Sequence, residues 1–146
     1  MAFPWLEIRK NEAYPVFTNT SSDQHDPWTS KDSKPDESGQ INAFFRWKTI
    51  KDTKNEFAIE LRLAKKGEFD FPVEIPKEST ADVTLRRLQS FKVAKDRKYF
   101  WKLMRNSSVA ASGQIRPDLE SLLTIPRIRI TNVPAQLRMR SVELPN

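Results

Sequence analysis

Residues 98–104 read Lys-Tyr-Phe-Trp-Lys-Leu-Met, and this stretch limits the folds open to the chain more than any other. Its large apolar side chains fall on alternate positions, at Tyr99, Trp101 and Leu103. That spacing is the two-residue period of a strand with one buried face. A basic run precedes the stretch and polar residues 106–108 follow it, so the pattern predicts a central β-strand with a turn after it.

The same alternation recurs along most of the chain, and no segment shows the 3.6-residue period of a helix. The predicted strands are 41–48, 57–63, 81–85, 98–104, 109–115, 123–131 and 136–142, with Pro-broken pieces at 5–8, 14–17 and 71–76. We expect strands 41–48 and 57–63 to form an antiparallel hairpin, and strand 109–115 to return from 98–104 with a bulge or bend at Gly113. About seven to nine short strands of this kind predict an all-β, two-sheet antiparallel β-sandwich.

A chain of 146 residues with 38% hydrophobic side chains fits one domain with a full core. Residues 1–40 are expected to contribute short strand pieces and a long polar loop at 18–40, and residues 41–142 the sandwich itself. By the parity of their strands, the following side chains should form the structural core between the two sheets: Trp47, Ile59, Val83, Tyr99, Trp101 and Leu103.

Charge is unevenly distributed along the chain. The first 40 residues carry four basic and seven acidic side chains, a net of −3, so the rest of this +6 chain carries +9. If the last two strands pair, four arginines project from one face: Arg127, Arg129, Arg138 and Arg140. Such a face suits an anionic ligand held by guanidinium groups, although basic residues on strands also serve only to keep sheet edges apart.

Tryptophans outside the predicted core are the second lead to a ligand. Trp5 stands beside a proline and Trp28 lies in the long polar loop. Either could stack on a sugar ring or a base, or could cap one end of the sandwich. The sequence argues against nucleic acid as the partner, because it has no Gly-rich aromatic strand, zinc ligand set or recognition helix.

The residues available for catalysis and metal binding are few. The chain has no Cys, and its single His, His25, lies in an Asp-Gln-His-Asp stretch without a second cluster of ligands. No nucleophile elbow or phosphate-binding glycine loop is present, and most acidic residues fall at predicted turns. We therefore expect no catalytic residue, no metal site and no cofactor.

Residues 43–115 resemble a fibronectin type III or immunoglobulin-like module. The resemblance comes from Phe-Phe-Arg-Trp47 closing an early strand, the alternating strand 57–63, a short edge strand, and Tyr99 opening a later strand. It implies that Trp47 is a core residue and that the Tyr99 hydroxyl bonds to upstream backbone. The corner at residues 93–96 departs from the family's Leu-Pro-Gly type, and residues 1–40 and 125–142 have no counterpart in it.

More loosely, the Gly-Gln-Ile-Arg-Pro-Asp and Leu-Leu-Thr-Ile-Pro stretches are similar to accessory modules of secreted bacterial polysaccharide-degrading enzymes. This resemblance implies a non-catalytic, secreted, periplasmic or cell-surface module that binds glycans weakly or spaces domains. Its partners would be a polysaccharide or a neighbouring catalytic domain. The first residues do not form a signal peptide and no apolar run is long enough for a membrane span. Two alternatives stay open: a polyanion-binding protein that uses the basic face, or an accessory domain of an enzyme whose catalytic domain lies outside this chain.

Overall fold

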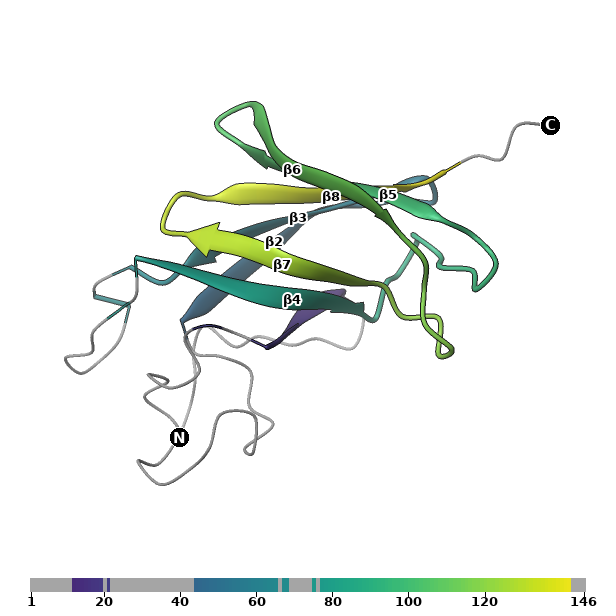
Figure 1. Cartoon of the computed structure of the whole chain (residues 1–146), viewed down its shortest axis with the longest axis horizontal. Coiled ribbons are helices and arrows are strands. Elements are labelled where there is room, and N and C mark those ends of the chain that lie inside the picture. The colour runs from purple at the N-terminus through teal and green to yellow at the C-terminus, as the bar shows by residue number, and fades with distance from the viewer. Residues whose placement is uncertain are drawn as a thin grey trace, which may run out of the picture.

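A computed structural model describes residues 12–19, 21, 44–65, 67–68, 75 and 77–142. The described residues form eight strands and no helix: β1 Tyr14–Thr18, β2 Phe45–Asp52, β3 Glu56–Leu63, β4 Glu78–Arg86, β5 Tyr99–Arg105, β6 Ser108–Ile115, β7 Thr124–Thr131 and β8 Ala135–Ser141. They make two antiparallel sheets that pack against each other (Figure 1), with strand orders β1-β4-β7 and β2-β3-β8-β5-β6. The predicted all-β, two-sheet antiparallel sandwich is confirmed.

Most of the predicted strands are present near their expected bounds. The β2–β3 hairpin forms as predicted, and β2 extends to Asp52 because a bulge at Ile50 lets its ladder with β3 continue. The stretch 98–104 forms β5, an interior strand that lies between β8 and β6. The predicted piece at 5–8, most of the loop 18–40 and the piece at 71–76 except Ile75 lie outside the described residues.

The hydrophobic core fills the space between the sheets. Ile59 and Val83 are completely buried, and Tyr99, Trp101 and Leu103 of β5 are buried with them. Trp47 lies on the edge strand β2 and is only partly buried where it packs against this core. At the start of β2 the core is filled by Phe44 and Phe45, which are both completely buried.

The turn between β5 and β6 is a two-residue hairpin turn built without glycine. Asn106 and Ser107 both have positive φ, 52° and 64°, as a type I′ turn requires. The bulge predicted at Gly113 falls instead at Ala110, where the β5–β6 register shifts. Gly113 is paired in register with Trp101, and a Cβ at this position would lie 3.0 Å from the Trp101 Nε1 atom. A glycine here therefore makes room for the indole.

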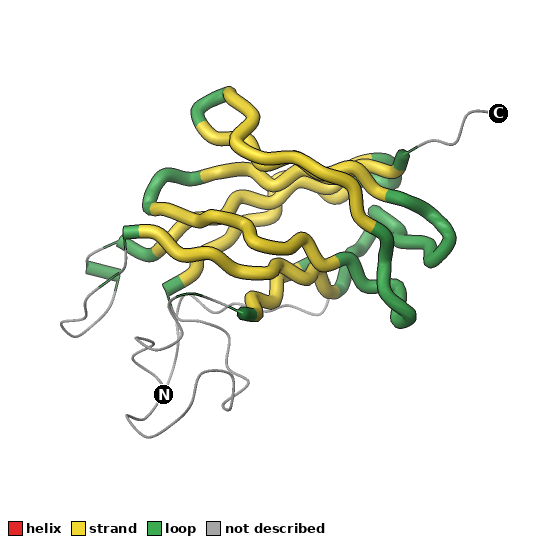
Figure 2. The backbone as a smooth tube through the Cα atoms, viewed as in Figure 1, coloured by secondary structure: helices red, strands yellow, loops and turns green. Residues whose placement is uncertain are grey.

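Tyr99 anchors the chain where it crosses from β4 in one sheet to β5 in the other. Its hydroxyl accepts a hydrogen bond from the Ala94 N–H at 2.8 Å and donates one to the Lys92 carbonyl at 3.2 Å. The hydrogen bond to upstream backbone that the resemblance implies is therefore present. The crossing loop lies at the same end of the sandwich as the β6–β7 loop (Figure 2), and Asp52 fixes its start by accepting the N–H groups of residues 89–91.

The last two strands do not pair with each other. β7 is an edge strand of the three-stranded sheet and β8 is the middle strand of the five-stranded sheet. Residues 132–134 carry the chain from one sheet to the other instead of closing a hairpin. The expectation that four arginines of these strands share one face is therefore wrong.

Candidate functional site

The predicted ligand-binding residues separate into three groups in the structure. Trp5 and Trp28 lie outside the described residues, as does His25. Arg127 and Arg129 are exposed on β7 in the three-stranded sheet. Arg138 and Arg140 are exposed on β8 in the five-stranded sheet, on the face that points away from the core.

Each β7 arginine contacts an acidic side chain, Arg129 through its guanidinium group and Arg127 through its backbone N–H. The Arg129 Nε donates to the Glu78 carboxylate at 2.8 Å, and Arg129 forms an ion pair with it. Arg127 has a left-handed backbone with φ 54°, and its N–H donates to Asp82 at 3.0 Å. The two arginines therefore lie on the bulged edge strand of the three-stranded sheet, where the charge of Arg129 is paired.

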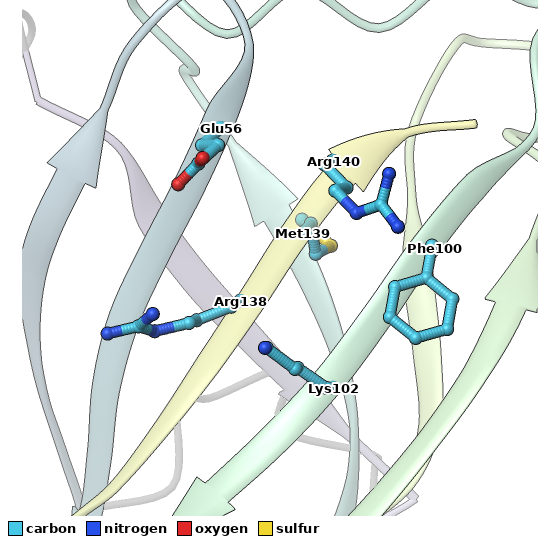
Figure 3. Close-up of a pocket in the computed structure, with 6 residues that line it drawn as sticks. All are labelled: Glu56, Phe100, Lys102, Arg138, Met139 and Arg140. Atoms are coloured by element: carbon cyan, nitrogen blue, oxygen red, sulfur yellow. The ribbon is translucent and has the colours of Figure 1, made fainter. Parts of the chain in front are cut away.

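The β8 arginines border a depression of about 210 Å³ on the outer face of the five-stranded sheet. Figure 3 shows its lining, in which Arg140 lies close to Phe100 and Lys102 points from β5 toward β8. The core residue Met139 lies beneath it. Three neighbouring strands, β3, β8 and β5, thus contribute to one site, whose lining residues are Glu56, Phe100, Lys102, Arg138, Met139 and Arg140.

Strand register explains why these side chains come together. Arg140 is paired with Glu56 of β3 on one side and with Phe100 of β5 on the other. Arg138, two residues earlier and so on the same face, is paired with Ala58 and with Lys102. The small Ala58 leaves room on β3, and Arg138 extends toward that strand (Figure 3).

The electrostatic balance of the depression is positive. Among the described residues, no carboxylate forms an ion pair with Lys102, Arg138 or Arg140. Glu56, the one acid of the lining, is paired with Lys51 at 3.1 Å in an exposed position. An unbalanced group of cations on one surface attracts anions and orients them through charge-assisted hydrogen bonds.

Neutral groups orient the two arginines and leave their charge uncompensated. The Nε and Nη2 atoms of Arg138 both donate to the Gln136 side-chain oxygen, at 3.1 and 2.9 Å. The guanidinium carbon of Arg140 lies 5.3 Å from the centre of the Phe100 ring, a cation–π arrangement. Both guanidinium groups are therefore partly preorganised for an incoming anion.

Phe100 was not selected as a site residue from the sequence, and Lys102 was not placed beside Arg138 and Arg140. The alternation that places Trp101 inward also places its two neighbours on the outer face of β5. What the sequence could not supply was the neighbour of β5, because the pairing of β5 with β8 joins residues far apart in the chain. The sequence indicated which residues of each strand point outward, but it did not indicate the order of the strands across the sheet.

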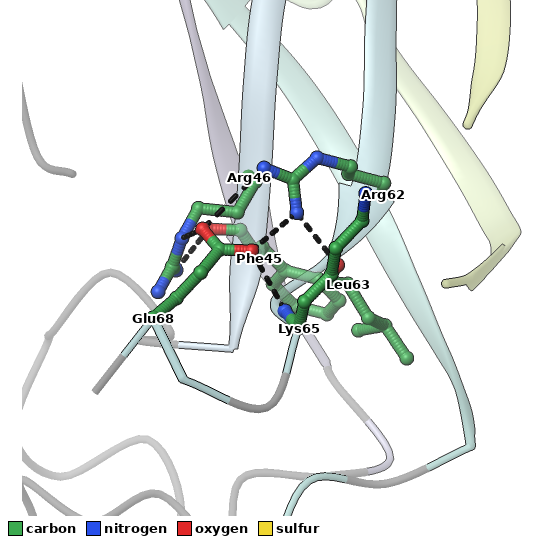
Figure 4. A network of polar contacts seen from close by, with 6 residues as sticks. All are labelled: Phe45, Arg46, Arg62, Leu63, Lys65 and Glu68. Carbon is green, nitrogen blue, oxygen red and sulfur yellow. Dashed lines mark hydrogen bonds and ion pairs between the residues drawn. The ribbon is translucent and has the colours of Figure 1, made fainter. Parts of the chain in front are cut away.

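A second polar cluster joins β2, β3 and the turn after β3 (Figure 4). The Glu68 carboxylate accepts hydrogen bonds from Arg62 at 2.6 Å, from Arg46 at 3.1 Å and from the Lys65 N–H at 2.7 Å. Burial opposes ionisation of Glu68, but the hydrogen bonds from Arg62, Lys65 and Arg46 outweigh it and lower the pKa of Glu68 to about 2. Burial also lowers the pKa of Arg46, partly offset by Glu68. One carboxylate is thus shared by two guanidinium groups, and these contacts connect the turn after β3 to the sheet.

Metal ligands and membrane-spanning helices are two further features of interest in the part of the chain that the structure describes. It contains no group of three or more His, Cys, Asp or Glu side chains placed to hold a metal ion. It also contains no helix long and apolar enough to cross a membrane. Comparisons of the chain with protein-family models, curated proteins and solved structures find no match.

Proposed function

We propose that this protein is a non-catalytic module that binds an anionic polysaccharide on the outer face of its five-stranded sheet. The observation that carries the proposal is the depression lined by Lys102, Arg138 and Arg140, with no carboxylate among the described residues paired to any of the three. Uronate or sulfate groups suit such a site, because a guanidinium group can bind two oxygens of a planar carboxylate or of a tetrahedral oxyanion through two parallel hydrogen bonds.

The scarcity of exposed aromatic rings in the site favours a sugar polymer over nucleic acid. Proteins that bind single strands of nucleic acid stack several bases on exposed aromatic rings. The depression has one aromatic side chain, Phe100, whose face is already covered by Arg140. Its open position on a sheet lets a polymer extend past it in either direction.

The wider role belongs to the same proposal. We place the module outside the cytoplasm, as a fibronectin type III-like accessory unit of carbohydrate-processing machinery. Support comes from the sequence resemblance and from the hydrogen bonds of the Tyr99 hydroxyl, which tie β5 to upstream backbone as in that family. The resemblance favours a glycan as the ligand and the basic site favours an anion, so an anionic glycan satisfies both.

Retention on immobilised polymers tests the proposal. The wild-type chain should be retained by heparin and by polygalacturonate, released by moderate salt, and not retained by a neutral glucan. Substitution of Lys102→Gln with Arg140→Gln should weaken binding by about tenfold or more, because two charge-assisted contacts are lost. The matched control, Lys95→Gln with Arg97→Gln, removes the same charge from the exposed β4–β5 loop and should change binding less than about twofold.

Three results would count against the proposal. Equal retention on the neutral glucan and on the two anionic polysaccharides would show that charge is not what the site recognises. Equal weakening by the two double variants would show that binding follows net charge alone. Retention on DNA but on neither anionic polysaccharide would move the ligand to nucleic acid.

A further inference from the structure

β6 forms an outer edge of the five-stranded sheet and pairs only with β5 among the described strands. Its residues are exposed, apart from Gly113 and Ile115, which are partly exposed. From Ser108 to Ile115 it has no charged side chain and no proline, although 30% of the chain's residues are charged. An edge strand of this kind presents unpaired N–H and C=O groups to another strand.

The other sheet edges are protected against such pairing. β1 contains Pro15, β2 contains Lys51 beside its bulge, and β7 contains Pro126 beside its own bulge. Prolines, lysines and bulges are the means by which natural proteins block edge-to-edge contacts. β6 has a single bulge at Ala110, next to the hairpin turn, which leaves residues 111–115 as an unprotected ladder.

We propose that a second copy of this chain occupies the β6 edge, in an antiparallel pair centred on Gly113. Charge singles out this edge for self-association. The chain carries a net charge of +6, so contact through β2 or β7 would bring basic side chains of the two copies together. Contact through β6 brings no charged side chain of the strand against another.

The side chains of β6 are complementary to themselves in this register. Ser112 of one copy faces Gln114 of the other on the outer side of the sheet, which pairs a polar side chain with a polar one. Ala111 faces Ile115 on the inner side, which pairs an apolar side chain with an apolar one. Gly113 meets Gly113 at the two-fold axis, where no side chain keeps the backbones apart.

The inner side of β6 also lacks a cover. Ala111 and Ile115 share the inward face of the sheet with Trp101, because they are paired with Leu103 and Tyr99 of β5. Ala111 is nevertheless exposed and Ile115 partly exposed. A second copy beside β6 would shield these side chains, which the three-stranded sheet leaves open.

Self-association would also change how the basic site works. An antiparallel pair of edge strands joins the two five-stranded sheets with their outer faces on the same side. Two depressions would then face one polymer, and binding at the first would raise the effective concentration at the second. This consequence rests on the proposed function, whereas the pairing of β6 does not.

Sedimentation velocity and light scattering measure the assembly without any ligand. At high micromolar concentration the chain should have the mass of two chains, where one chain is 17.0 kDa. Ser112→Lys with Gln114→Lys places lysines opposite each other and should halve the mass. The control Asn55→Lys with Thr80→Lys adds the same charge at exposed positions outside β6 and should stay dimeric.

The absence of native Cys allows a test of register. A mixture of the Ser112→Cys and Gln114→Cys variants should form intermolecular disulfides on mild oxidation, because paired residues across antiparallel strands bring their Cβ atoms within disulfide range. Either variant alone should cross-link far less. A monomer at all concentrations, a dimer that survives Ser112→Lys with Gln114→Lys, or cross-linking no greater in the mixture would overturn the inference. A monomer that still binds anionic polysaccharide would leave the proposed function intact.

Discussion

The Glu68 cluster makes stability depend on pH in a way that one substitution should abolish. Arg46 is buried with 6% of its side chain exposed, and Glu68 is its carboxylate partner. Glu68→Gln keeps the shape of the side chain but removes its charge. It should weaken the hydrogen bonds and ion pairs that this side chain makes with the buried Arg46 and with Arg62.

The size of the effect follows from the pKa of Glu68, which is about 2 in the folded protein against an ordinary value of 4.5. A shift of that size corresponds to at most about 3.5 kcal/mol, since each pKa unit is about 1.4 kcal/mol. Solvent at the partly exposed carboxylate reduces this to about 1–2 kcal/mol. Because the folded pKa is the lower one, the contribution is fully present above pH 4.5 and is lost as the pH falls toward 2.

Urea unfolding of the wild type and Glu68→Gln across a series of pH values measures this contribution. At pH 7 the variant should be less stable by about 1–2 kcal/mol, and the gap should close steadily below about pH 4.5. Glu120→Gln, in an exposed turn, is the matched control and should track the wild type throughout. A gap that stays constant down to about pH 3, or no gap at neutral pH, would refute the role assigned to the cluster.

Two other substitutions test the hairpins and loops. Tyr99→Phe removes the hydroxyl that bonds Ala94 and Lys92, and it should lower the free energy of unfolding by about 1–2 kcal/mol and Tm by several degrees in a thermal melt. An unchanged melt would show that the hydroxyl adds nothing to stability. Ser107→Gly relieves a left-handed backbone with φ 64° and should raise the free energy of unfolding by about 0.5–1 kcal/mol in urea titrations. A fall would mean that the turn does not have the type I′ form.

Alternation of side chains was sufficient to predict most strands and most of their buried faces, although in β2 Trp47 is only partly buried and Arg46, on the opposite parity, is buried. The pattern at 98–104 places Trp101 in the core because the period of a strand is a local property of the backbone. The hairpins β2–β3 and β5–β6 were also predictable, since each is closed by a short polar turn. Local signals therefore specify the strands and the partners of those joined by short turns, β2 with β3 and β5 with β6.

The order of strands across the sheets was not predictable in this way. Period two assigns Arg129 and Arg138 to outward faces but does not say which sheet each face belongs to. The three residues between β7 and β8 look like a hairpin loop, yet they cross between sheets. Whether such a loop closes a hairpin or crosses between sheets depends on which arrangement of strands buries the most apolar surface. That is a non-local property of the chain. The basic depression was missed for the same reason, because Arg140 and Phe100 meet only through the β5–β8 pairing.

The most direct test of the basic site is an amide NMR titration with a short anionic oligosaccharide, such as a heparin-derived tetrasaccharide. The largest shift changes should fall on β5 and β8 at Phe100, Lys102, Arg138 and Arg140, and they should vanish in Lys102→Gln with Arg140→Gln. The amides of Arg127 and Arg129, on the other sheet, should stay unchanged. Shift changes centred on β7, or a titration that leaves β5 and β8 unmoved, would contradict the site.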